Sequence, residues 1–105
     1  IDRNKNIVYT VTMSSNKSNE NNDIKELAEI FSTMKSDDEI RQFLLEILTD
    51  SELAVLSKRW RIMKMLSEGC TQREIAKELN VSLCKVTRGA KILKDKSAIV
   101  KKYLR

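Results

Sequence analysis

The sequence has no histidine and no proline, only two glycines, and five aromatic residues. The lack of proline and the scarcity of glycine and aromatic residues favour helices over sheet. Without histidine, the commonest metal ligand and general base is missing. Cys70 and Cys84 do not stand at a metal-ligand spacing, and no glycine-rich loop could cradle a phosphate. We therefore expect an all-α protein that binds no metal, holds no resident cofactor and is not an enzyme.

Long apolar runs are also missing. None approaches the roughly 20 residues that a membrane span requires. No apolar stretch of adequate length follows the first charges, so a secretory signal peptide is not expected. Two thiols in a chain without such a signal are typical of reduced cytosolic cysteines. The sequence predicts a cytoplasmic protein with no membrane partner.

The charges are distributed unevenly along the chain, whose formal net charge is +5. Residues 1–22 carry three basic and two acidic side chains, residues 23–56 three and nine, and residues 57–105 fourteen and four. A basic half joined to an acidic half is typical of a nucleic-acid-binding face attached to an assembly module. Two solvated surfaces of opposite sign would give the same pattern.

The chain is expected to divide at residue 22. Residues 1–22 end in a polar run without apolar periodicity and are predicted to be disordered. From residue 23 onward, apolar residues recur at helical spacing, which predicts a single all-helical domain, residues 23–105. Within it we expect a dimerisation core at 23–69, a helix-turn-helix at 70–94 and a terminal helix in 95–105.

Helix boundaries are marked by capping signals. Ser36 with Glu39, and Thr49 with Glu52, are spaced as capping boxes and predict where the second and third helices begin. Gly69 is expected to end the third helix in the left-handed conformation. Three shorter helices follow, near 72–79, 83–94 and 96–104, which makes six in total.

Residues 71–90 match the requirements of a helix-turn-helix. Thr71 and Glu74 form a further capping box, Ala76 is small enough for two helices to cross closely, and Asn80 suits a turn position with positive φ. Ser82 is the expected N-cap of the second helix. The residues predicted to point inward are Ile75, Leu79, Val81 and Val86. The alternative is a generic helical hairpin with good caps.

The amino-terminal end of the second helix is the part that meets base edges in the major groove. The side chains left exposed there are predicted to be Leu83, Cys84, Lys85 and Thr87.

The run from Leu48 to Lys94 resembles the Trp repressor family. The resemblance is carried by Arg59-Trp60-Arg61-Ile62, Thr71-Gln72-Arg73-Glu74 and Val86-Thr87-Arg88-Gly89. It implies an intertwined homodimer with six helices per chain, and a pocket for L-tryptophan as corepressor. It also adds Gln72, Arg73 and Lys91 to the expected DNA contacts.

Carried over by position, the resemblance implies how L-tryptophan would be held. Arg59 and Arg88 would sandwich the indole ring, and Arg88 would also pair with the carboxylate. Gly89 would allow close approach of the ring. The remaining expected ligand contacts are Leu48 and Thr49 from the other subunit, together with Ile62 and Ile92. Each has a plainer alternative, such as a surface arginine, a helix cap or helix packing.

The sequence thus predicts a sequence-specific DNA-binding transcriptional repressor that uses L-tryptophan to orient its helix-turn-helix. One alternative is a DNA-binding regulator of the same fold with a different effector or none, because Ile92 stands where tryptophan-binding members carry a serine. A second alternative is a helical module for protein–protein assembly.

Overall fold

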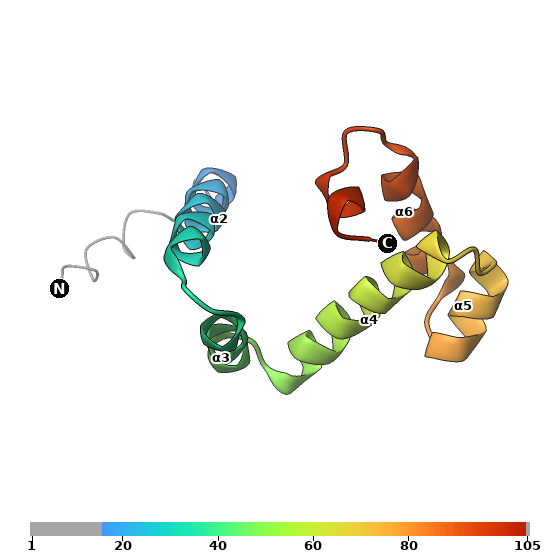
Figure 1. Ribbon diagram of the computed structural model, residues 1–105, viewed down its shortest axis with the longest axis horizontal. Helices are drawn as coiled ribbons and strands as arrows, with labels where there is room; N and C mark the ends of the chain where they lie inside the picture. The colour runs from blue at the N-terminus through green and yellow to red at the C-terminus, as the bar shows by residue number, and fades with distance from the viewer. Residues whose placement is uncertain (1–15, 105) are drawn as a thin grey trace, which may run out of the picture. The chain divides into compact units, whose positions relative to one another are not determined.

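The computed structural model describes residues 16–104, which form helices and turns and contain no strand (Figure 1). The all-α prediction is confirmed. None of the described helices is long and apolar enough to cross a membrane. The described residues divide into two compact units, with the boundary between Phe43 and Leu44. In chain order the elements are α2 (Asn16–Thr33), α3 (Asp37–Ile47), α4 (Asp50–Ser67), α5 (Gln72–Leu79), α6 (Leu83–Lys94) and the 3₁₀ helix η1 (Ile99–Tyr103).

The predicted sixth α-helix, residues 96–104, was wrong in type. The segment forms only the short 3₁₀ helix η1, so residues 16–104 hold five α-helices. The Asp95 carboxylate accepts hydrogen bonds from the Ser97 backbone N–H at 2.9 Å and from the Ser97 hydroxyl at 2.8 Å. These two bonds lower the pKa of Asp95. They also fix a turn after α6, and Ala98, which precedes η1, provides no side-chain cap for a longer helix.

Helix α2 begins earlier than the sequence predicts. Residues 16–22, which we expected to be disordered, are part of this helix, and residues 1–15 lie outside the described part of the chain. Residues 16–22 contain neither proline nor glycine. Extending a helix past its first turn fixes few dihedrals for each hydrogen bond gained, so a polar stretch can follow the helical path of the amphipathic segment beside it.

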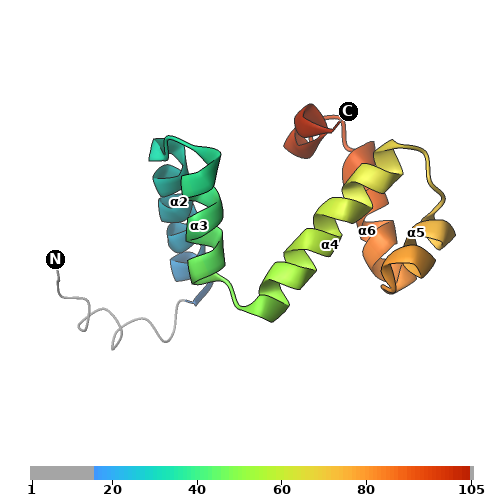
Figure 2. The ribbon, with the colours of Figure 1, turned by 60° about the horizontal axis from the view of Figure 1, so that its bottom comes forward.

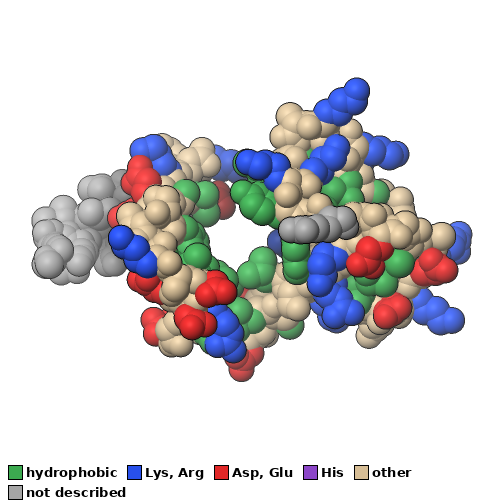
Figure 3. All heavy atoms as spheres, viewed as in Figure 1, with side chains coloured by type: hydrophobic (Ala, Val, Ile, Leu, Met, Phe, Trp, Pro, Cys, Tyr) green, Lys and Arg blue, Asp and Glu red, His purple; other side chains and the backbone are tan. Residues whose placement is uncertain are grey.

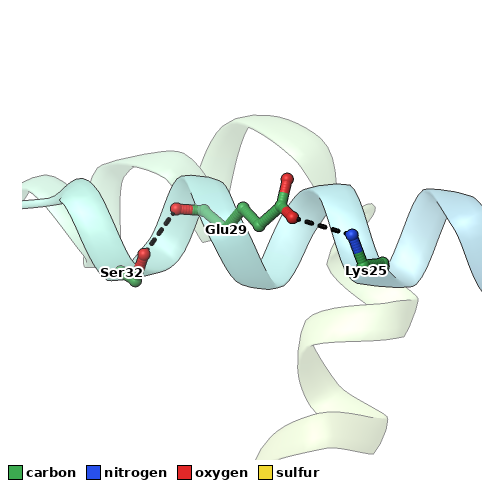
Figure 4. A network of polar contacts seen from close by, with 3 residues as sticks. All are labelled: Lys25, Glu29 and Ser32. Atoms are coloured by element: carbon green, nitrogen blue, oxygen red, sulfur yellow. Dashed lines mark hydrogen bonds and ion pairs between the residues drawn. The ribbon is translucent and has the colours of Figure 1, made fainter.

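Two aromatic rings join α2 and α3 in the first unit. The rings of Phe31 and Phe43 meet edge to face, with centroids 5.3 Å apart and planes at 77°. Figure 2 shows the two helices side by side. On the outer face of α2, Lys25 pairs with Glu29 at 3.1 Å, and the Ser32 hydroxyl donates to the Glu29 backbone carbonyl (Figure 4).

The second unit is built from α4, α5 and α6, which pack on one another. Each contributes one buried side chain to a small core: Ile62 from α4, Ile75 from α5 and Val86 from α6. The partly buried residues around them are Met65, Leu66, Cys70, Ala76, Leu79 and Val81. The predicted inward positions of the helix-turn-helix are therefore confirmed.

The predicted caps form as expected, with one variation. Both capping boxes at the starts of α4 and α5 are reciprocal, with distances of 2.9–3.2 Å. Ser36 caps α3 through the Glu39 N–H at 3.2 Å, but the Glu39 carboxylate accepts from the backbone N–H of Lys35 instead of Ser36. Gly69 has the predicted positive φ, 95°.

Candidate nucleic-acid interface and ligand pocket

The turn between α5 and α6 fixes the direction of α6. Asn80 ends α5 with φ 54° and ψ 53°, the left-handed conformation predicted for it. Its backbone N–H still bonds to the carbonyls of Ala76 and Lys77. Ser82 then caps α6 by accepting from the Lys85 N–H at 3.4 Å. Two residues of defined backbone conformation thus position the first turn of α6.

The exposed face of α6 carries most of the predicted DNA contacts. Leu83 is 44% exposed although it is apolar, and Cys84, Thr87 and Lys91 are exposed as well. A shallow groove of about 510 Å³ runs along this face, and its lining residues are Leu83, Cys84, Thr87, Arg88, Lys91 and Ile92. One helix face therefore brings together four of the seven predicted contacts along one groove.

The other predicted DNA contacts lie around this face. Gln72, at the start of α5, accepts a 2.9 Å hydrogen bond from the Thr87 hydroxyl, which connects it to α6. Arg73 is exposed next to it on α5. Lys85 lies on the side of α6 that faces α4, where it lines two pockets.

A pocket of about 140 Å³ lies between α4 and α6. Its lining residues are Arg59, Ile62 and Met63 from α4, and Lys85, Arg88, Gly89 and Ile92 from α6. Five of the seven predicted ligand contacts thus surround one pocket. The sequence analysis did not assign Met63 and Lys85 to it. Met63 stands four residues after Arg59, and Lys85 four residues before Gly89, so helical spacing from the assigned residues could have found both.

Gly89 has a packing role that involves no ligand. A Cβ at this position would lie 3.1 Å from Cγ2 of Ile62, 3.2 Å from Cδ1 of Leu66 and 3.3 Å from Sδ of Met63. Contacts of that length are tighter than nine in ten real Cβ contacts, so the neighbouring side chains would have to shift by a few tenths of an ångström. Glycine therefore lets α6 approach α4 closely at the edge of the pocket.

Leu48 and Thr49 do not line this pocket. Leu48 lies in a separate depression of about 390 Å³ at the start of α4, which Arg59 also borders. Thr49 is the N-cap of α4, and its hydroxyl accepts from the Glu52 N–H at 3.1 Å. The resemblance assigns both residues to the pocket of the other subunit. One protomer does not test this assignment, so it stays a prediction.

The pocket is cationic. Three of its lining side chains are Arg59, Lys85 and Arg88, and no acidic residue lines it. On the face drawn in Figure 3, lysine and arginine side chains gather around α6 and η1. Among residues 16–104 no cluster of three or more potential metal ligands occurs. The site therefore suits an anionic group next to an apolar surface.

Comparison with known proteins assigns the family. The sequence pattern described as "Trp repressor protein" matches residues 22–105. The chain belongs to the Trp repressor family. It is 40% identical over 80 residues to a "Trp operon repressor homolog" of Xylella fastidiosa (strain M23), a match that covers 75% of this chain and 85% of that protein.

Two chlamydial proteins of the same name are also similar. The protein of Chlamydia caviae is 33% identical over 78 residues, 73% of this chain and 77% of its own length. That of Chlamydia trachomatis serovar D is 35% identical over 79 residues, 70% of this chain and 84% of its own length. No solved structure matches the chain. By family, this chain is a repressor-like regulator, and the family is a regulatory one with no enzymatic role.

Proposed function

We propose that this member of the family is a DNA-binding repressor that works in the cytoplasm, places α6 in the major groove and has no catalytic role. The observation that carries the proposal is the exposed face of α6, where Leu83, Thr87 and Lys91 stand along one groove next to a capped first turn. An exposed apolar side chain at this end of a reading helix suits contact with a thymine methyl group.

The repressor acts as a homodimer in this proposal. Only three side chains of residues 16–104 are fully buried apolar ones, whereas Ile47, Leu56 and Trp60 are 52%, 45% and 40% exposed. Exposed apolar side chains on α3 and α4 favour burial against a partner. A second copy would cover it and would bring two α6 helices to half-sites about 34 Å apart, one turn of DNA.

L-tryptophan is the proposed corepressor. Arg59 and Arg88 border the pocket from opposite helices, and a guanidinium both stacks on an aromatic face and binds a carboxylate through paired donors. Ile62 and Met63 supply apolar surface for the ring. Thr49 and the carbonyls near Leu48 would come from the second subunit. Bound ligand would fix the angle between α6 and α4, and so select the dimer geometry that fits the operator.

Calorimetric titration of L-tryptophan into the purified full-length protein tests this proposal. We expect saturable binding of one ligand per chain, and loss of that binding in Arg88→Ala. Arg73→Ala is the matched control, because Arg73 is exposed on α5 and lines none of the pockets described above. It should keep tryptophan binding while weakening the retention of selected duplex DNA. Absence of heat and of any thermal shift at millimolar ligand would remove tryptophan as the effector.

A second candidate is a regulator of the same fold with another effector or none. Ile92 favours it, because this half-buried residue lines the pocket where tryptophan-binding members carry a serine. An isoleucine offers no hydroxyl to the ligand and takes up more room. Selection of duplexes from a random pool, with and without L-tryptophan, separates the two candidates. Enrichment that is the same in both conditions would favour the second.

A further inference from the structure

A second pocket lies next to the turn of the helix-turn-helix. It has a volume of about 250 Å³, and we refer to it as the α4–turn pocket. Its lining residues are Ala54, Val55, Lys58, Arg59 and Ile62 from α4, Asn80, Val81 and Ser82 from the turn, and Lys85 from α6. The pocket therefore borders the segment that leads directly into the first turn of α6.

The α4–turn pocket carries three cations and no acidic side chain. Lys58 and Arg59 come from α4 and Lys85 from α6. Among residues 16–104, none of the three has a carboxylate in ion-pair contact. Three like charges that converge on one depression repel each other, and an anion placed between them would relieve this repulsion.

The remaining lining strengthens the attraction of an anion. Ala54, Val55, Ile62 and Val81 make one side of the pocket apolar. Charges next to a low-dielectric wall interact more strongly than charges in open water. Ser82 stands at the rim as the N-cap of α6, where it accepts from the Lys85 N–H, and the preceding N–H groups of Leu83 and Cys84 have no intrahelical acceptor.

We propose that the α4–turn pocket binds a phosphate of the DNA backbone, and that Lys58 is a DNA contact from outside the helix-turn-helix. This inference rests on the proposed DNA-binding function. A free phosphate or another small anion has the same chemistry, but the position of the pocket favours the duplex. The DNA backbone that flanks the groove entered by α6 would pass the Asn80–Ser82 turn. Lys58 from α4 and Lys85 from α6 would then contact one of its phosphates from two sides.

The test is the salt dependence of duplex binding. A protein that neutralises one phosphate fewer should lose about 0.9 from the slope of log K against log salt concentration. We expect Lys58→Gln to show this loss, together with a several-fold weaker affinity at physiological salt, and Lys58→Arg to restore both. Lys64→Gln is the control, because Lys64 is exposed on the same helix and lines none of the pockets. It should behave as the wild type.

The outcomes separate this inference from the proposed function. If the wild type retains no selected duplex, both fail. If the wild type binds but Lys58→Gln has the slope and affinity of Lys64→Gln, the phosphate contact at Lys58 is wrong and the proposed function stands. If inorganic phosphate raises the unfolding temperature of the wild type but not of Lys58→Gln while the slope is unchanged, the pocket takes a free anion and the inference is overturned.

Discussion

The Thr87 hydroxyl donates a 2.9 Å hydrogen bond to the side-chain carbonyl oxygen of Gln72, and so joins the two helices of the helix-turn-helix on their exposed side. The bond spans 15 residues and lies outside the apolar core. It holds in one geometry two side chains that the sequence assigns to DNA contact. Ordering them before DNA arrives lowers the entropic cost of binding.

Removing this bond should weaken DNA binding more than folding. Thr87→Val keeps the shape of the side chain but loses the donor, and a typical hydrogen bond contributes about 0.5–1.5 kcal/mol. We expect roughly a 3- to 10-fold weaker affinity for selected duplex, measured by fluorescence anisotropy, and little change in unfolding temperature. Thr87→Ser retains the hydroxyl and should bind nearly as the wild type. Wild-type affinity in Thr87→Val would show that this bond makes no contribution to DNA binding.

Adding a methyl group at Gly89 should destabilise the protein. Alanine is favoured over glycine inside a helix by about 1 kcal/mol, but here its Cβ would lie 3.1 Å from Cγ2 of the buried Ile62. Overpacking of this kind costs about 1–3 kcal/mol. We expect Gly89→Ala to lower the free energy of unfolding in urea. A double-mutant cycle with Ile62→Ala should show coupling; strictly additive effects would mean that this contact is not the cause.

Asn80 should be replaceable by glycine but not by alanine. Its φ of 54° costs a residue with a Cβ roughly 1–2 kcal/mol unless its side chain helps locally, as asparagine does. We expect Asn80→Ala to unfold at lower urea concentration than the wild type, and Asn80→Gly to match or exceed it. A stable alanine variant would indicate that the turn can adopt another conformation.

The chain's only tryptophan offers a measure of self-association. Trp60 is 40% exposed in the protomer, and a second copy covering α4 would bury it. We expect its fluorescence to shift to the blue as protein concentration rises, and Trp60→Glu to sediment as a monomer. Leu83→Glu is the matched control, because Leu83 is similarly exposed but lies on the groove face of α6. It should still dimerise. Monomers in both variants would point to general destabilisation.

Asp95 should make stability depend on pH in the acid range. The Ser97 N–H and hydroxyl donate to its carboxylate and lower its pKa from 3.8. The stabilisation is therefore present above the unfolded pKa and is lost as pH falls through the folded pKa. We expect Asp95→Asn to be less stable than the wild type at neutral pH, with a difference that shrinks on acidification below about pH 4. If the difference in unfolding free energy between the two proteins does not change with pH, the Asp95 carboxylate is not the source of the stabilisation.

The features that the sequence predicted are those set by local chemistry. The capping boxes at Thr49 and Thr71, the left-handed Asn80 and the inward positions of Ile75 and Val86 each depend on residues a few positions apart. Their geometry follows from helix periodicity and backbone sterics. The family resemblance added Arg59, Arg88, Gly89 and Ile92, which one pocket brings together.

The sequence analysis missed two kinds of feature. Some are decided by weak local preferences that compete with one another, and others by contacts between residues far apart in the chain. The polar start of α2 has no periodicity to mark it, and the Asp95–Ser97 turn limits the last segment to η1. Lys58 carries no local signal, because only the packing of α4 on the Asn80 turn places it near Lys85. The resemblance assigns Gly89 to close approach of a ligand, whereas the contacts that a Cβ would make with α4 show a packing reason for glycine as well.

The small core has a consequence for the concentration at which this regulator is stable. Only Ile62, Ile75 and Val86 are fully buried apolar residues in the described protomer. If a second copy supplies the missing burial, the free energy of folding becomes a function of protein concentration. At concentrations below the dissociation constant of the dimer, monomers would unfold more often and be cut by proteases. The repressor would then be removed when scarce and persist once abundant. A threshold copy number would follow from the packing itself.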